Sequence, residues 1–321
     1  MTTASLLLYL YAESPVHAGA AAADGVLDLP IQREAATGYP LVWGQSLKGA
    51  LRQAAGEAGW DLEAVTAVFG SDIADNGDGQ QAGGGQGEDT DEATTPGSLM
   101  VGDAQLVALP VPTLRRSFAW ATSPLALARL ARKHALMEID PPAPVELEDA
   151  EAAAADEFWS GPRGEVLGPC VVDIPALEAD AANPVRAWAA HLSRTALAGD
   201  HLAPFAKKFS TDLVALDETV MRTLLRECTE FAVRVQLGRQ TKTVQQMFTS
   251  EYLPAETLLA ALITLRTDTP LIESEASAHL QRLHTLLDGK PLRIGGQEST
   301  GKGLMWARLV GPATPQEHHD G

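Results

Sequence analysis

The chain has 321 residues, of which 45% are hydrophobic, and this is enough apolar material for a globular core. Its net charge of -18 argues at first against a nucleic-acid partner, because phosphate binding normally draws on an excess of lysine and arginine. The acidity is regional, however: residues 71–97 hold seven acids and no base, and residues 140–180 hold eleven acids and one arginine. The remainder is close to neutral, so basic clusters there can still contact RNA.

The signals for export, disulfides and structural zinc are weak. Residues 1–14 contain an apolar run but lack the basic start and cleavage site of a signal peptide, and no apolar run of about 18 residues follows. Cys170 and Cys228 show no CxxC spacing, which disfavours a disulfide framework and a zinc site. We therefore expect a cytoplasmic protein without a membrane-spanning segment.

In chain order, the hydrophobic pattern alternates between strand and helix periods. In the first half it predicts a strand over 5–11, helices over 46–57 and 62–69, strands over 99–109 and 113–121, and a helix over 124–136. In the second half it predicts helices over 185–198, 218–226 and 274–287, strands over 229–237 and 303–310, and an apolar run over 257–266.

Two segments interrupt this alternation. Residues 74–97 are rich in glycine, glutamine and acid and predict a flexible acidic insertion. Residues 140–182 are rich in proline, alanine and acid and predict an acidic surface insertion of loops and short helices. With a flexible tail expected over 312–321, the chain is predicted to be a single α+β domain, residues 1–321, with a ferredoxin-like core that carries insertions.

A glycine-rich segment near the C-terminus nearly matches a P-loop, with Gly296, Gly301 and Lys302 at the required spacing. Gly303 stands where a hydroxyl group would bind magnesium, and a strand pattern follows where a P-loop needs a helix. These departures disfavour an NTPase. Two interpretations stay open: the loop contacts nucleic-acid phosphates through N–H groups and Lys302, or it is a structural turn.

Residues 42–55 begin with small polar residues and enter a predicted helix, with Gln45 or Ser46 as its cap. Lys48 and Arg52 are four residues apart and so share one helical face. A helix start with two nearby cations suits phosphate groups, although a solvated basic face has the same pattern.

Asp28 lies between two leucines in a long connection, residues 14–40, which is punctuated by glycine and proline. A carboxylate in such a loop can bind a divalent metal or orient a nucleophile for phosphodiester cleavage. The alternative for Asp28 is a turn or capping role. For His17, which lies in the same connection, a structural role is the favoured interpretation.

Residues 236–251 predict a protruding hairpin with basic and apolar side chains, among them Arg239, Lys242, Thr243 and Met247. Such a hairpin can enter a nucleic-acid duplex and separate stacked bases. An ordinary surface hairpin is the alternative.

In their order along the chain, these segments resemble the RAMP superfamily of CRISPR proteins, and specifically its type III-B, Cmr-type backbone subunit. The resemblance is carried by SPVHAG, DLPIQRE with TGYPLVWGQSLKGALR, GDAQLVALPV with FAWATSP, TKTVQQMFTSEYLPAETLL, and IGGQESTGKGL. DLPIQRE followed by WGQSLKG is specific to this subfamily, whereas the glycine-rich loop marks only the wider superfamily.

The resemblance implies an RRM-like palm with a protruding thumb, and several copies stacked along a guide RNA together with other Cmr subunits. It implies a metal-dependent endoribonuclease, using Mg or Mn, that cuts complementary target RNA at regular intervals, with Asp28 as the catalytic and metal-binding residue. The RNA-binding residues would be His17, Gln45, Ser46, Lys48, Arg52, Arg239, Lys242, Thr243, Met247, Gly295, Gly296 and Lys302. A purely architectural guide-binding subunit is the alternative.

Overall fold

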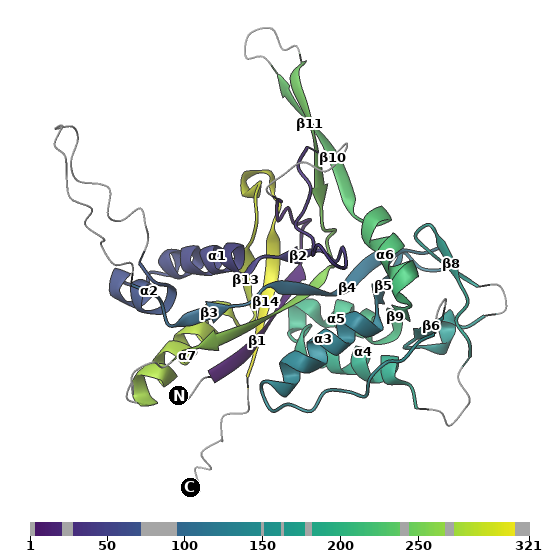
Figure 1. Ribbon diagram of the computed structural model, residues 1–321, viewed down its shortest axis with the longest axis horizontal. Coiled ribbons are helices and arrows are strands. Elements are labelled where there is room, and N and C mark those ends of the chain that lie inside the picture. Colours follow the sequence, from purple (N-terminus) through teal and green to yellow (C-terminus); the bar gives the residue numbers. More distant parts are fainter. Residues whose placement is uncertain are drawn as a thin grey trace, which may run out of the picture.

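The computed structural model describes residues 4–20, 28–71, 95–148, 151–161, 164–176, 182–237, 244–266 and 273–311. A large mixed sheet runs through the molecule with strand order β13-β14-β1-β12-β4-β5-β9-β6, while β2 pairs with β4 and β3 with β12 (Figure 1). Strands of this sheet and helices occur in turn along the chain, so the prediction of an α+β fold is confirmed.

The first half of the sheet is antiparallel and centres on β1 (Ala4–Ala12). β12 (Leu258–Leu265) and β14 (Leu304–Val310) flank it, and β4 (Ala104–Pro112) follows β12. From Leu6 to Leu10 the side chains of β1 are large and buried because both faces of the strand are covered: Leu8 joins one hydrophobic cluster and Leu7 the other.

Two helices follow strands of this half along the chain, α1 (Gly44–Glu57) after β1 and α7 (Glu273–Leu287) after β12. With β4 and β14 they give the chain order β-α-β-β-α-β. The finer likeness to an RRM stays a prediction.

The second half of the sheet is formed by β5 (Phe118–Thr122), β9 (Leu213–Leu216) and β6 (Ala152–Ala154), with β5 and β9 parallel. The helices of this half are α3 (Pro124–Ala135), α4 (Pro184–Thr195), α5 (Ala203–Asp212) and α6 (Glu218–Glu227). The shorter elements are β2 (Leu41–Val42), α2 (Leu62–Phe69), β3 (Leu99–Val101), η1 (Glu157–Trp159), β7 (Glu165–Leu167), β8 (Cys170–Val172), η2 (Asp200–Leu202), β13 (Lys290–Arg293) and η3 (Glu298–Thr300).

A hairpin of β10 (Glu230–Leu237) and β11 (Val244–Tyr252) stands out from the body of the molecule (Figure 1). Residues 238–243, between its strands, lie outside the described ranges. Within those ranges, every helix is too short or too polar to span a lipid bilayer.

Two predicted strands differ from the observed ones. The strand expected over 99–109 is two strands, because Gly102 and Asp103 interrupt it and Asp103 Oδ1 accepts a hydrogen bond from the N–H of Gly44 at 2.7 Å. The strand expected over 113–121 begins only at Phe118, because Thr113 and Arg116 close a turn through the Thr113 hydroxyl group.

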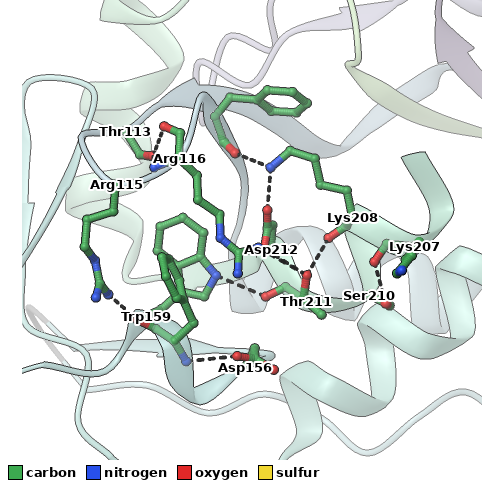
Figure 2. A network of polar contacts seen from close by, with 12 residues as sticks. Thr113, Arg115, Arg116, Asp156, Trp159, Lys207, Lys208, Ser210, Thr211 and Asp212 are labelled. Carbon is green, nitrogen blue, oxygen red and sulfur yellow. Dashed lines mark hydrogen bonds and ion pairs between the residues drawn. The ribbon is translucent and has the colours of Figure 1, made fainter. Parts of the chain in front are cut away.

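Described parts of the acidic segment 140–182, which was expected to be a surface insertion, are built into the fold. β6 is the end strand of the large sheet, and Trp159 is fully buried, with Nε1 donating to Thr211 O at 3.0 Å. Figure 2 shows Arg116 reaching from the turn before β5 to Asp212, beside the indole ring of Trp159. Because these contacts are long-range, local composition does not reveal them. Of the insertion expected over 74–97, only 95–97 are described, and the tail 312–321 lies outside the described residues.

Candidate nucleic-acid interface

Asp28 lies at the base of the projecting hairpin. One of its carboxylate oxygens, Oδ2, accepts a hydrogen bond from the N–H of Thr249 on β11 at 2.8 Å. Leu29 donates to Thr249 O at 3.1 Å and accepts from the N–H of Glu251 at 3.0 Å, so the segment after Asp28 runs beside β11. The carboxylate is exposed although its backbone is fixed.

Glu251, on β11, ties this segment to the hairpin and to Thr229, which lies between α6 and β10. Its carboxylate is buried, pairs with Arg33 at 2.5 Å, and accepts hydrogen bonds from the N–H of Ile31 at 3.2 Å and from Thr229 Oγ1 at 2.9 Å. Sequence reasoning missed Glu251, although it lies within one of the segments that carry the family resemblance. The sequence signal that could have pointed to Glu251 was a single acid in TSEYLP, within a stretch that is otherwise typical of a strand.

His17 joins the same junction from the other side. Its Nδ1 lies 2.8 Å from the carbonyl oxygen of Glu251, which can only accept, so Nδ1 carries the proton and donates. The residue is 7% exposed, and the centre of its ring lies 5.6 Å from the centre of the Tyr252 ring. His17 is thus mostly enclosed and holds the loop to β11.

The glycine-rich loop reaches this junction through its backbone. The N–H of Gly296 donates to His17 O at 2.9 Å. Gly295 has φ of 86°, and a Cβ atom there would lie 2.4 Å from His17 O, so glycine is required for this close approach. Lys302 Nζ lies 4.9 Å from the centre of the Tyr252 ring. His17, Asp28 and the glycine-rich loop therefore all contact the base of the hairpin.

The start of α1 forms a separate region. Its N-cap is Trp43, which makes no capping bond through its side chain, so the expectation that Gln45 or Ser46 caps the helix was wrong; Asp103 accepts from the first N–H instead. Gln45 and Lys48 line a cleft of about 640 Å³. Burial, and next the nearby Arg52, lower the pKa of Lys48.

Two predicted RNA-binding residues of α1 are placed differently. Arg52 does not line this cleft; its guanidinium group donates to Gly70 O at 2.5 Å and so connects α1 to the end of α2. Ser46 is half-buried and is also absent from the lining.

On the hairpin, Met247 is 59% exposed and pairs across the strands with Val235. Phe231 and Val233 are also exposed, and alternation along β10 places them on the same face as Val235. The predicted contact residues Arg239, Lys242 and Thr243 lie outside the described residues.

The residues fit a divalent cation only in part. In the described part of the chain, no three His, Cys, Asp or Glu side chains gather as a metal site. Asp28 offers one exposed carboxylate, and one of its oxygens already accepts from Thr249. Mg²⁺ is often held by one or two carboxylates together with substrate phosphates and water, so Asp28 suits a site that RNA would complete.

Comparison with known proteins gives concordant matches. The description of the RAMP superfamily matches residues 9–306. The CRISPR system Cmr endoribonuclease Cmr4 of Pyrococcus furiosus is 29% identical over 307 residues, covering 94% of this chain and 95% of that protein. Oligomeric Cmr4 from Pyrococcus furiosus superposes with a TM-score of 0.70 at 26% identity, over 98% of this chain and 100% of that one.

A more distant structural match shows the same fold. It is a chain of type III-B Cmr-beta bound to cognate target RNA, with a TM-score of 0.66 at 17% identity, over 95% of this chain and 97% of that one.

Proposed function

The chain belongs to the RAMP superfamily, and from this premise we propose that it is the repeated backbone subunit of a type III-B CRISPR effector complex. In this proposal, copies stack along a guide RNA beside other Cmr subunits, and each copy cleaves complementary target RNA. Its partners are then guide RNA, target RNA, further copies of itself and the other subunits. The resemblance seen in the sequence to the RAMP superfamily is confirmed.

The observation that carries the proposal is the position of Asp28. An exposed carboxylate is fixed by the N–H of Thr249 at the base of a projecting hairpin, where His17 and the glycine-rich loop also meet. RNA that follows the hairpin to its base would pass this carboxylate. The similarity over nearly the whole chain to a protein named as an endoribonuclease supports the same assignment.

The proposed chemistry gives each residue a limited role. Asp28 binds a divalent cation beside the scissile phosphate, or it orients the neighbouring 2′-hydroxyl group for attack. Glu251 and Arg33 act as positioning residues, because they hold the segment after Asp28 against β11. His17, mostly enclosed, supports the same loop.

The divalent metal, Mg or Mn, is part of the proposal. When bound, such an ion would neutralise charge on the scissile phosphate. Asp28 would supply its protein ligand, and RNA and water would supply the others. Chelation with EDTA should then stop cutting in the assembled complex while RNA binding persists.

The main test uses the complex assembled with Asp28→Ala and labelled complementary RNA. Evenly spaced cuts should fall by about 100-fold or more, with target binding retained, because the substitution removes the carboxylate that holds the metal or orients the nucleophile, and the loss of a positioned catalytic group typically costs this much. Asp140→Ala, which changes another exposed aspartate, is the matched control. Undiminished cutting by Asp28→Ala would reject the assignment, and no cutting by the wild-type complex would favour the architectural subunit.

The termini of the products separate the two roles of Asp28. Attack by the 2′-hydroxyl group leaves a cyclic phosphate, and a single deoxynucleotide before the cut would block it. Attack by water needs no such hydroxyl group, and the substituted RNA would still be cut.

A further inference from the structure

A second cleft lies against the segment that carries Asp28. Its volume is about 620 Å³, and its walls come from residues 30–38, the exposed side of α6 and the start of β10. Pro30 and Ile31, in its wall, follow Asp28 so closely that about 10 Å of extended chain spans the distance. The cleft is therefore a direct neighbour of the candidate catalytic carboxylate.

Two guanidinium groups dominate the charge of this cleft. Its carboxylates are already paired, Glu251 with Arg33 and Glu34 with Arg129. Arg222 and Arg226 are exposed, lie four residues apart on α6, and have no acidic partner in the ranges that the structure describes. The cleft thus carries two uncompensated cations in a protein whose net charge is -18.

An aromatic ring completes the lining. Phe231 is 52% exposed, is the second residue of β10, and pairs across the hairpin with Glu251. Proteins hold single-stranded nucleic acid with this combination, because bases stack on an exposed ring while phosphates meet arginine.

The walls of the cleft are tied together without a ligand. Thr229 Oγ1 lies 3.3 Å from the carbonyl oxygen of Arg226 and 2.9 Å from Glu251 Oε1. Glu251 in turn holds Arg33 and the N–H of Ile31. α6, the hairpin and the Asp28 segment therefore form one preorganised unit, and little ordering would be needed on binding.

From this arrangement we propose that the cleft is a nucleotide subsite for the RNA strand that is cleaved. It receives the nucleotide next to the scissile phosphate, with its base on Phe231 and its phosphate between Arg222 and Arg226. The subsite rests on the proposed function, and it sets which phosphate of the strand lies over Asp28.

The first experiment measures target binding by complexes that carry Asp28→Asn to prevent cutting. Arg222→Ala with Arg226→Ala should weaken binding about tenfold and lower the dependence of log affinity on log salt by about one. Arg132→Ala with Arg194→Ala is the matched control, since both are exposed arginines on helices α3 and α4 outside the cleft, and this variant should bind like the parent. The mass and guide content of each complex are measured first.

The second experiment detects stacking with 2-aminopurine placed in turn at each nucleotide flanking one cut site. One position should differ in fluorescence from its neighbours. Phe231→Leu should abolish that difference, whereas Phe231→Tyr, which keeps the ring, should preserve it.

The outcomes separate the two proposals. If the wild-type complex cuts target RNA but the cleft variants match it in affinity, salt dependence and fluorescence, the subsite is wrong and the proposed function stands. If the arginine double variant assembles with fewer copies while target binding per copy is unchanged, the cleft is a protein interface and the subsite is again wrong. If the wild-type complex does not cut target RNA, the proposed function is wrong, and the subsite that rests on it is wrong as well.

Discussion

Glu251 and Asp212 are both buried carboxylates paired with an arginine, but they connect different parts of the chain. Asp212 is held by Arg116 and Lys208 and joins α5 to the turn before β5 (Figure 2). Glu251 is held by Arg33 and joins the hairpin to the segment of Asp28. Both sites satisfy a charge that would be costly to bury alone, but only the second touches the candidate site.

Substitutions at the two sites should therefore separate effects on stability from effects on cleavage. Removing one partner of a buried ion pair leaves the other charge without compensation, and that destabilises the fold wherever the pair lies. A shift in the Asp28 segment, in contrast, would move a carboxylate that must meet RNA. The two carboxylates should therefore give similar losses of stability and different losses of cleavage.

Of the two carboxylates, Glu251 should give the larger effect when it is changed to glutamine. The amide keeps the shape of the side chain but cannot neutralise Arg33, so the free energy of unfolding should fall by about 3 kcal/mol. Cleavage per assembled complex should fall by about 100-fold, because a misplacement of about 1 Å at a catalytic group costs that much. Denaturant unfolding of the chain and target cutting by the complex measure the two effects. Loss of stability with normal cutting would show that Glu251 is only a structural residue.

Asp212→Asn should produce only the first of these effects. The fully buried carboxylate loses its charge beside Arg116 and Lys208, so stability should again fall by about 3 kcal/mol. Cleavage per assembled complex should stay within about twofold of the wild type. A loss of cutting as large as that of Glu251→Gln would remove the distinction between the two regions.

The contrast also shows what local sequence can reveal. The helix over 62–69 was predicted with its observed bounds, and β1 within a residue at each end, because their patterns are local. β6 was missed because Ala152–Ala154 has low strand propensity and becomes a strand only beside β9.

The same reasoning applies to the site. Asp28 was singled out from its place in a long loop and from the resemblance, and the assignment stays a prediction. Glu251 was not found, because its partner Arg33 is more than 200 residues away along the chain and the pairing exists only in the folded state.

A third buried polar cluster contains no carboxylate and should respond to pH instead. His134 Nε2 lies 3.2 Å from the hydroxyl group of Tyr9 and 3.3 Å from His191 Nε2. Burial, followed by the nearby His191, lowers the pKa of His134 to about 4. The folded state then binds fewer protons than the unfolded state, whose histidine pKa is about 6.5. This contribution to stability is complete above about pH 6.5 and is lost as the pH falls toward 4.

The expected loss is about 2 kcal/mol by pH 4.5, measured by denaturant unfolding across this range. His134→Gln removes the titrating group and should flatten this part of the pH profile. An unchanged profile in His134→Gln would assign the acid sensitivity to other groups.

The smallest expected effects concern two cations of α1, of which one is predicted to bind RNA and the other to stabilise the fold. Arg52 is already bonded to Gly70 O, whereas Lys48 lines the cleft at the start of the helix. Lys48→Ala should weaken guide binding by about the same factor for every guide sequence and reduce the salt dependence by about one phosphate contact, since such contacts carry no sequence information. Arg52→Ala should act mainly on the packing of α1 against α2 and lower stability by about 1 kcal/mol, with little change in salt dependence. Titrations of several guide RNAs at different salt concentrations measure both effects. Losses of affinity that depend on guide sequence would contradict the assignment of Lys48 to a phosphate contact. A change in salt dependence from Arg52→Ala as large as that from Lys48→Ala would contradict the division between a cation that binds RNA and one that stabilises the fold.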